Sequence, residues 1–507
     1  MPLDASPTPL VGETACDVLI IGGGPAGSTA ATLLAEKGRR VVMLERDRHP
    51  RFHIGESLLP LNLKVFERLG VTDEVAAIGV HKPGARFVSD EHGKHTAFSF
   101  AAGLNQDYTY SYQVRRSSFD EVLFRRAQRA GADAREGMRV LDVALEARGR
   151  GALEARGGGA LEARGRGALE ARGGGALEAR GRGALEARGS GALDAPGGHR
   201  VTARDEAGAI HAFRARFVMD CSGRDTVLAS AMGSKARNPH NNTAALYGHF
   251  RGVAPFGARD DSAPLSAPDT GAPLGAAEDG NITIHLFDEG WFWMIPLPDG
   301  VMSVGVVSNP GFFKRRRGEP REFFLETLRA VPSVARRIAD AELVSDVTTT
   351  GNYSYASTVM HGDGWLMAGD AYAFIDPVFS SGVLLAMASA EMGADVADAW
   401  LDDPARAAPM ARAFEAKVKR AIGSLSWLIY RINTPVLRDM FMEPRNRFRM
   451  REGLVSLLAG DVHTNANRQL PVLAFKGAFY ALSLAYRLGY RLRPEGLVRV
   501  RAAAPAP

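Results

Sequence analysis

The chain has 507 residues, 46% of them hydrophobic, and its length allows about three domains of ordinary size. Its formal net charge is +5, but the arginines are scattered without interleaved aromatic residues, which argues against a nucleic-acid partner. Two cysteines exclude a disulfide framework and indicate a reducing, cytoplasmic compartment, and the 12 histidines show no metal-ligand spacing.

The first clear pattern along the chain is a strand, a glycine-rich turn and a helix. An apolar run ends in Gly-Gly-Gly-Pro-Ala-Gly, which fits GxGxxG, and a helix of small residues is predicted over 28–37. Gly22 allows a tight turn, Gly24 lets the backbone approach a pyrophosphate, and Gly27 allows the helix to pack closely on the strand. We expect these glycines and Ala26 to bind a dinucleotide.

A second apolar strand, predicted over 40–44, supports this interpretation. It ends in Glu45, 18 residues after Gly27, where a carboxylate can accept a hydrogen bond from a ribose hydroxyl. A complete βαβ pattern is stronger evidence for dinucleotide binding than the glycine motif alone. Residues 1–14, in contrast, contain neither a basic nor an apolar segment, and we do not expect them to be a signal peptide.

Residues 144–198 form a low-complexity tract in which a leucine recurs every eight residues from Leu145 to Leu193. Two or three glycines in each octad oppose a continuous helix, and a period of eight matches no helical repeat. Strand-like pieces at 138–143 and 199–203 flank the tract and would otherwise form a hairpin. A surface hairpin accepts a long insertion because closure entropy grows slowly with length. We therefore predict a flexible insertion without a catalytic role.

Four strands are predicted to form an antiparallel sheet on the substrate side, at 244–251, 282–287, 291–296 and 301–307. A segment before the second strand, 254–279, is rich in proline, glycine, alanine and aspartate, and is either a disordered loop or a mobile flap. The third strand has the pattern WxWxIP. Because Trp291 and Trp293 are alternate residues, they point to the same side, where they wall off a pocket or simply pack in a core.

The last third of the chain is mostly helical. A helix predicted over 382–400 is apolar but contains three acidic residues, which favours a buried helix over a membrane span. A final helix is predicted over 473–492. Its apolar stripe is either core or a surface that docks a carrier protein, and it consists of Phe475, Phe479, Tyr480, Leu484, Ala485 and Leu488.

Three further motifs resemble the glutathione-reductase-like FAD fold of the hydroxylase and monooxygenase superfamily. They are Gly-Asp-Ala at 369–371, D-x-S-G-R at 220–224 and V-x-R-x-x-F-D at 114–120. The resemblance implies an α/β, Rossmann-type fold with an antiparallel substrate-side sheet and a helical C-terminal region. It also implies that Asp370 holds the ribitol of FAD, that Arg116 supports the phosphates, and that the helix start around Val383 lies near the flavin ring.

Within that superfamily the chain resembles the flavin-dependent halogenases, and most closely the branch that acts on carrier-bound substrates. The resemblance rests on WxWxIP, on Lys82 in its motif and on the Phe-Ser-Ser-Gly turn that ends at Gly382, and it extends from residue 16 to about 460. It implies one catalytic unit over 16–410 with interleaved FAD and substrate segments. The insertion at 144–198 and a mostly helical region at 411–507 complete the expected organisation.

The halogenase resemblance implies an electrophilic halogenation of an aromatic or activated carbon in secondary metabolism. FADH2, oxygen and a halide, with chloride expected before bromide, would give hypohalous acid. In this scheme Ser381 and Gly382 bind the halide, and Trp291 and Trp293 keep the substrate from the flavin. Lys82 receives the hypohalous acid, either through a hydrogen bond from its ammonium or as a chloramine.

Several points remain open at the level of sequence. Glu56 either supports the flavin side, relays protons or is a structural carboxylate. No second complete dinucleotide fingerprint is present for NADPH, so a separate flavin reductase is expected as a partner, and the mildly basic surface suits an acidic carrier protein. Two alternatives use the same fold without needing Lys82 or WxWxIP. They are an FAD-dependent monooxygenase or geranylgeranyl-reductase-like enzyme, and a flavin-binding protein without catalytic activity.

Overall fold

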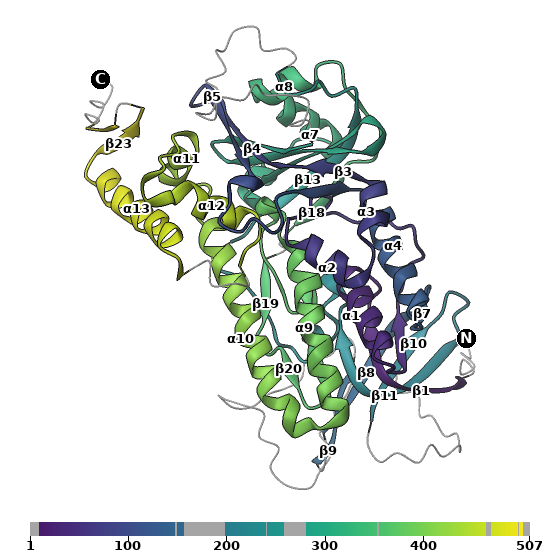
Figure 1. Cartoon of the computed structure of the whole chain (residues 1–507). Coiled ribbons are helices and arrows are strands. Elements are labelled where there is room, and N and C mark those ends of the chain that lie inside the picture. The colour runs from purple at the N-terminus through teal and green to yellow at the C-terminus, as the bar shows by residue number, and fades with distance from the viewer. Residues whose placement is uncertain are drawn as a thin grey trace.

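Among its described residues, the computed structural model contains two large β-sheets and three small ones, a set of helices packed on the large sheets and a helical C-terminal region (Figure 1). It describes residues 10–147, 150–156, 198–239, 241–257, 280–351, 354–462, 468–494 and 496–499. Most of the predicted insertion and the segment 258–279 therefore lie outside the described residues, and the flexibility expected of both is untested.

The first sheet carries the glycine-rich turn. Its strand order is β7-β2-β1-β11-β10-β8-β9, with β21 beside β11. β1 is parallel to both β2 and β11, and β11 is parallel to β21, so the carboxyl ends of these strands meet at one edge of the sheet. The parallel strands are β1 (Leu10–Ile21), β2 (Val41–Leu44), β7 (Asp133–Arg135), β11 (Ile210–Asp220) and β21 (Trp365–Met367).

The hairpin predicted around the insertion is present. β8 (Arg139–Ala147) pairs in antiparallel fashion with β10 (His199–Arg204). The first octad departs from the expectation of a flexible tract, because residues Arg150–Arg156 form β9, which pairs with the other edge of β8. The open edge of β8 offers unpaired backbone N–H and C=O groups, and the segment that follows it in the sequence forms hydrogen bonds with them as β9.

Helices cover the first sheet. α1 begins at Pro25, earlier than the predicted residue 28, because proline is well suited to the first helical position. α1 packs on α9 and on α4, and α9 packs on α10. In Figure 1, α9 and α10 are the two long antiparallel helices beside α1. Their bounds are α1 (Pro25–Glu36), α4 (Arg116–Arg129), α9 (Gly382–Asp402) and α10 (Pro404–Ile429).

The second sheet confirms the predicted antiparallel strands. Its order is β17-β13-β16-β15-β14-β4-β5, with β18 beside β13. Four further strands, β4, β5, β17 and β18, were not predicted, and β14 is parallel to β4, which comes from far earlier in the chain. The strands are β4 (Gly84–Ser89), β5 (Lys94–Ser99), β13 (Ala244–Arg251), β14 (Ile282–Phe287), β15 (Gly290–Leu297), β16 (Val301–Ser308), β17 (Glu342–Leu343) and β18 (Thr348–Gly351).

The two faces of this sheet bury different residues. Phe292 and Met294 pack with Phe324 and Leu328 of α7 (Pro320–Arg329), which lies above the sheet with α8 (Pro332–Ile338) in Figure 1. The side chains of Trp291 and Trp293 lie on the opposite face of the sheet, where they pack with residues of the helical region. The alternation of strand side chains thus places both tryptophans between the two sheets.

The C-terminal region consists of α11 (Pro435–Met442), α12 (Met450–Leu458), α13 (Leu470–Arg487) and a hairpin of β23 (Tyr490–Arg493) and β24 (Gly496–Arg499). α13 ends before the predicted residue 492 because Gly489 takes a positive φ of 86° and the chain turns into the hairpin. The predicted helical region, 411–507, would begin inside α10, because that helix runs across the expected boundary at 410. Of the helices among the described residues, none is long and apolar enough to span a membrane.

Candidate active site

A cavity of about 420 Å³ lies between the two sheets, within the roughly 300–1,000 Å³ typical of small-molecule sites. It brings together most of the predicted site residues. Those that line it are Gly22, Gly24, Ala26, Glu45, Glu56, Arg116, Trp291, Trp293, Asp370, Ser381, Gly382 and Val383. Gly27 and Lys82 do not line it.

The glycine-rich turn has the predicted tight geometry. Gly22 has a φ of 98°, and its N–H donates to the carbonyl of Leu44 at 2.8 Å. A Cβ atom on Gly27 would lie 1.8 Å from the carbonyl oxygen of Gly22, so Gly27 permits the close packing of α1 on the turn. A Cβ atom on Gly24 would instead meet Arg51, at 3.4 Å from Nη2. The backbone at Gly24 therefore faces a guanidinium, as a bound phosphate requires.

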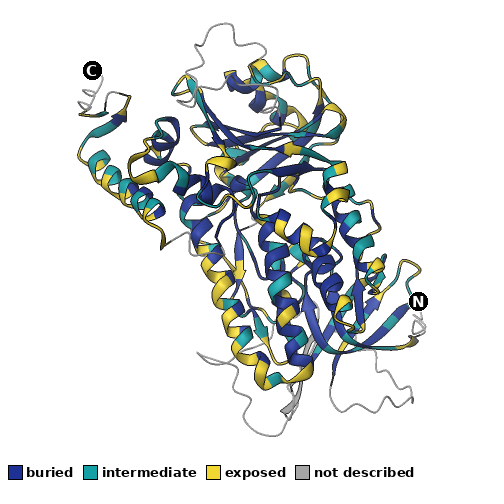
Figure 2. Cartoon of the chain, in the orientation of Figure 1, coloured by how far each residue is buried: buried dark blue, intermediate teal, exposed yellow. Residues whose placement is uncertain are grey.

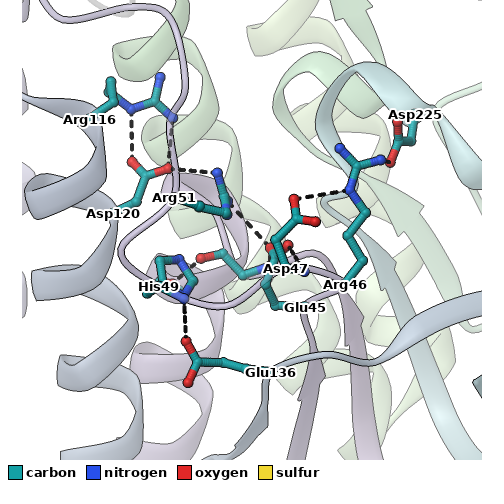
Figure 3. A network of polar contacts seen from close by, with 11 residues as sticks. Glu45, Arg46, Asp47, His49, Arg51, Arg116, Asp120, Glu136 and Asp225 are labelled. Carbon is teal, nitrogen blue, oxygen red and sulfur yellow. Dashed lines mark hydrogen bonds and ion pairs between the residues drawn. The ribbon is translucent and has the colours of Figure 1, made fainter. Parts of the chain in front are cut away.

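Glu45 lies at the end of β2 and is held in place by hydrogen bonds (Figure 3). Its Oε2 accepts from the N–H of Gly23 at 2.8 Å and from Arg51 Nη2 at 3.3 Å, and its Oε1 accepts from the N–H of Asp47 at 3.0 Å. The carboxylate is thus fixed beside the turn, where the sequence placed a ribose-binding group.

Arg51 links the two acidic residues of this network and was not identified from sequence. Besides Glu45, it pairs with Asp120 at 3.3 Å, and Arg116 pairs with the same carboxylate at 2.8 and 3.0 Å (Figure 3). Burial would raise the pKa of Asp120, but the adjacent Arg116, with Arg51 and His53, holds it below its usual value. Asp120 therefore holds the guanidinium groups of Arg51 and Arg116 at the cavity wall.

Asp370 lies further along the cavity, in the Gly-Asp-Ala turn of 369–371. Burial raises the pKa of its carboxyl to about 7. The backbone is fixed on both sides, because Tyr355 donates its hydroxyl to the carbonyl of Asp370 at 2.9 Å and the N–H of Gly369 donates to Ser389 at 2.9 Å. A polyol such as the ribityl chain offers suitable partners for this otherwise buried carboxyl group.

The predicted halide turn begins α9. Ser380 has a left-handed backbone with a φ of 56°, which directs the next residues into the helix. Ser381 is only 1% exposed, and its Oγ has no hydrogen-bond partner among the described residues. At Gly382 no atom within 4 Å would meet an added Cβ. The free N–H groups of a 21-residue helix and an unpartnered hydroxyl together favour an anion at this place.

Trp291 and Trp293 line the cavity side by side, with ring centroids 5.9 Å apart. The Nε1 atom of Trp293 donates to Ser303 at 3.1 Å on the neighbouring strand. Gly305 lies opposite Trp293 in the sheet, and a Cβ atom there would come within 2.2 Å of the indole ring. Gly305 therefore makes room for Trp293, a requirement that sequence reasoning missed.

Lys82 ends β3 (Gly79–Lys82), which pairs with β6 (Ser111–Val114). Its side chain is buried, and its Nζ donates to Ser57 Oγ and to the carbonyl of Leu58, both at 2.8 Å. No carboxylate of the described chain pairs with it, and burial lowers the pKa of Lys82 to about 7. Ser57 lines the cavity and separates Lys82 from it, so the amine lies one hydrogen bond behind the wall.

Glu56 has a partner that the sequence did not reveal. Its Oε1 lies 2.9 Å from Nε2 of His249 on β13, while its buried Oε2 has no partner in the described chain. Phe52 is 54% exposed and lies 5.8 Å from the His249 ring. Glu56 thus lines the cavity next to Ser57, and His249 supports its carboxylate from outside the lining.

Two family models match the chain. The model described as FAD binding domain matches residues 15–157, and the model described as Tryptophan halogenase matches residues 190–434. The second model lies within the range over which the sequence resembled the halogenases, 16 to about 460, and the first begins one residue before it.

Individual proteins give the same result. The flavin-dependent halogenase rdc2 of Metacordyceps chlamydosporia is 30% identical over 74% of this chain and 63% of its own length. The 1H-pyrrole-2-carbonyl-[peptidyl-carrier protein] chlorinase of Pseudomonas fluorescens is 26% identical over 90% of this chain and 91% of its own. The solved structure of the myxobacterial chondrochloren halogenase CndH is 26% identical, has a TM-score of 0.65 and covers 96% of this chain and 100% of that one.

The share of a relative's own length that this chain covers differs from one relative to the next. The chain spans about three fifths of the length of the first curated halogenases that it matches. The predicted FAD-type fold and the predicted family are both confirmed.

Proposed function

The chain belongs to the flavin-dependent halogenase family, and we propose that it halogenates an aromatic or activated carbon by means of hypohalous acid. Lys82 is the observation that carries the proposal. A buried amine with no carboxylate partner lies one hydrogen bond behind a cavity that also contains the tryptophan pair and the predicted halide turn. The monooxygenase alternative does not require such an amine.

The residues of the first sheet fit FAD. Gly22 forms the tight turn and Gly24 leaves space for the pyrophosphate, Arg51 and Arg116 supply positive charge, and Glu45 offers an acceptor for ribose. Asp370 is suited to the ribityl hydroxyls. When bound, reduced FAD supplies the oxidising chemistry that turns oxygen and halide into hypohalous acid.

The turn at the start of α9 supplies the halide site. Ser381 and the N–H groups at Gly382 and Val383 attract an anion to the N-terminus of the helix. Trp291 and Trp293 fill the space beside this site and keep a large organic substrate away from it. The small hypohalous acid is therefore the species that travels to the substrate.

Lys82 positions this oxidant. With a pKa of about 7, its side chain supplies both ammonium and neutral amine near neutral pH. The ammonium donates a hydrogen bond to hypohalous acid, and the neutral amine attacks its halogen, giving a chloramine and water. Ser57 lies between the cavity and Nζ, so its hydroxyl either relays the contact or rotates aside.

Glu56 and His249 serve proton transfer at the same wall. Halogenation of an aromatic carbon releases a proton, and the free Oε2 of Glu56 is a suitable acceptor. His249 donates to the other oxygen at 2.9 Å and steadies the carboxylate. Glu56 thereby takes the proton from the substrate, and Lys82 is not needed as the base.

The proposal includes two partners and a cytoplasmic location. A separate flavin reductase would supply FADH2. A carrier protein that bears the substrate is supported by the pseudomonad relative, whose name states a pyrrole-carbonyl group on a peptidyl carrier protein. We assign the catalytic work to residues 16–410 and regard 411–507 as a helical addition, although α10 runs across that boundary.

The test is to incubate the enzyme with FADH2, oxygen, and chloride or bromide. Candidate substrates are free phenols and pyrrole-carbonyl groups on a carrier protein, and mass spectrometry detects the product. Halogenated product is expected from the wild-type enzyme. A wild-type enzyme that hydroxylates these substrates and never consumes halide would support the monooxygenase, and one without any flavin turnover would support a non-catalytic flavin-binding protein.

Lys82→Ala separates the halogenation step from the flavin chemistry. This variant should continue to oxidise FADH2 while product halogenation stops, because the oxidant is no longer delivered. Lys82→Arg should also fail or nearly fail, since a guanidinium keeps the charge but has a different shape and does not readily deprotonate. Wild-type halogenation by Lys82→Ala would remove Lys82 from the mechanism.

A further inference from the structure

One face of α13 is apolar and exposed. The residues recur at intervals of three or four, so they lie in one row along the helix, which we name the α13 stripe. The stripe consists of Leu470, Leu473, Gly477, Ala481, Leu484 and Leu488. Its four leucines are 66, 52, 60 and 63% exposed, in chain order. In Figure 2 exposed residues recur along α13, at the margin of the molecule farthest from the first sheet.

The stripe is not the face that holds α13 on the protein. Val472, Phe475 and Phe479 point the other way and are buried with the core of the second sheet and the helices around it. The helix is thus apolar on two faces, of which the protein itself covers one. A helix that is apolar all round is normally buried on all sides. The apolar stripe found in the sequence is therefore part core and part uncovered surface.

We infer that the α13 stripe binds the same stripe of a second copy of this chain, in antiparallel orientation. The intervals along the stripe are nearly the same in both directions from its midpoint near residue 479. An antiparallel partner therefore faces Leu470 with Leu488, Leu473 with Leu484, and Gly477 with Ala481. A surface that is complementary to itself is what a two-fold symmetric dimer requires.

Gly477 gives a second reason for a helical partner. Glycine in a helix interior costs about 1 kcal/mol relative to alanine. Among the described residues no packing contact offsets that cost, because an added Cβ atom at Gly477 would have no atom within 4 Å. At the centre of a helix pair, however, glycine opposite alanine lets the two backbones approach closely.

Area and charge favour a second copy over other partners. The four leucines and the neighbouring Tyr480 expose on the order of 500 Å² of apolar surface, so two copies reach the roughly 1,000 Å² that a specific interface needs. The only charged residues of α13 are Lys476 and Arg487. Lys476 lies 5.2 Å from the Trp427 ring of α10, which leaves Arg487 as the one exposed charge of α13 beside the stripe. A single arginine is a weaker basic border than the lysine- and arginine-rich polar face with which helices bind a lipid surface.

The experiment measures the mass of the full-length, FAD-loaded protein in solution by light scattering after size exclusion. The wild type should be a dimer. Gly477→Leu should be a monomer without loss of thermal stability, because leucine is a better helix former than glycine, fits the single chain and blocks only the helix pair. Gly423→Leu is the matched control, since Gly423 is an exposed glycine of α10 that is equally free of neighbours. It should remain a dimer.

A charge pair tests the antiparallel alignment. Leu473→Glu and Leu484→Lys should each give monomers, whereas the two substitutions in one chain should restore the dimer, because each glutamate then faces a lysine of the other copy. Leu473→Glu combined with Leu484→Glu should stay monomeric.

Three results would overturn the inference. They are a wild-type monomer at every soluble concentration, a dimer that Gly477→Leu leaves intact, and a wild-type monomer that binds phosphatidylserine vesicles or an acidic carrier protein through the stripe. None of these measurements involves halogenation, so they do not depend on the proposed reaction.

Discussion

Replacing Lys82 by methionine should change how the stability of the protein depends on pH. Burial lowers the pKa of Lys82 from 10.5 to about 7, so between these values the unfolded chain holds a proton that the folded chain has released. Stability rises with pH wherever the unfolded state binds more protons. This contribution of Lys82 is complete above pH 10.5 and is lost as the pH falls toward 7.

The magnitude follows from one proton per molecule. Each pH unit in this window changes the free energy of unfolding by about 1.4 kcal/mol. When the pH is raised from about 7.5 to 9.5, the unfolding free energy of the wild type should therefore rise by about 2.7 kcal/mol relative to that of Lys82→Met. Below pH 7 the two curves should run parallel, because both states then carry the proton. Other titrating groups cancel, since the two proteins differ at this side chain alone.

The assay is denaturant unfolding followed by tryptophan fluorescence at several pH values. Lys64→Met controls for the loss of one positive charge, because Lys64 is an exposed residue of α2 (Asn62–Leu69). Parallel curves for the wild type and Lys82→Met over the whole range would refute the reasoning. They would mean that Lys82 stays protonated when buried and cannot act as a neutral amine near pH 7.

Three further predictions concern the cofactor turn, the tryptophan wall and the insertion. Gly24→Val should keep its melting temperature but lose FAD binding in calorimetric titration, because the new side chain fits beside Arg51 yet occupies the space of the pyrophosphate; tight binding would sink that role. Gly305→Ala should lose about 1–3 kcal/mol in unfolding free energy, because its Cβ meets the Trp293 ring at 2.2 Å, and an unchanged value would show that the ring moves freely. Replacing residues 149–198 by a short Gly-Asn linker should preserve halogenation, since β8 and β10 pair directly; an inactive but folded variant would give the tract a function.

The parts of the fold that sequence predicts are those with local signals. The turn around Gly22, the carboxylate of Glu45 and the strand with Trp291 and Trp293 each depend on spacing within a short segment, and each lies where it was expected. A parallel pairing such as β14 with β4 joins segments almost 200 residues apart, and no local pattern announces it.

The site residues that sequence did not reveal were missed for the same reason, because they depend on contacts between distant segments. Arg51 is important because it contacts Asp120, and His249 because it contacts Glu56, 193 residues away. Only tertiary packing creates either contact. Hydrophobic periodicity likewise found the apolar residues of α13, but a helix with apolar residues on two faces does not reveal which of them the protein covers.

The order of strands in the first sheet has a consequence for synthesis of the protein. β1 leaves the ribosome long before its second neighbour, β11, which begins only at Ile210, and β11 in turn waits for β21 at Trp365. Until then one edge of β1 lacks its partner and is open to association with other chains. At 5–20 residues per second, the 144–198 tract alone prolongs this exposure by roughly 3 to 11 s. Each octad added or lost would therefore alter the time during which a nascent chain needs a chaperone, even if the finished enzyme did not change.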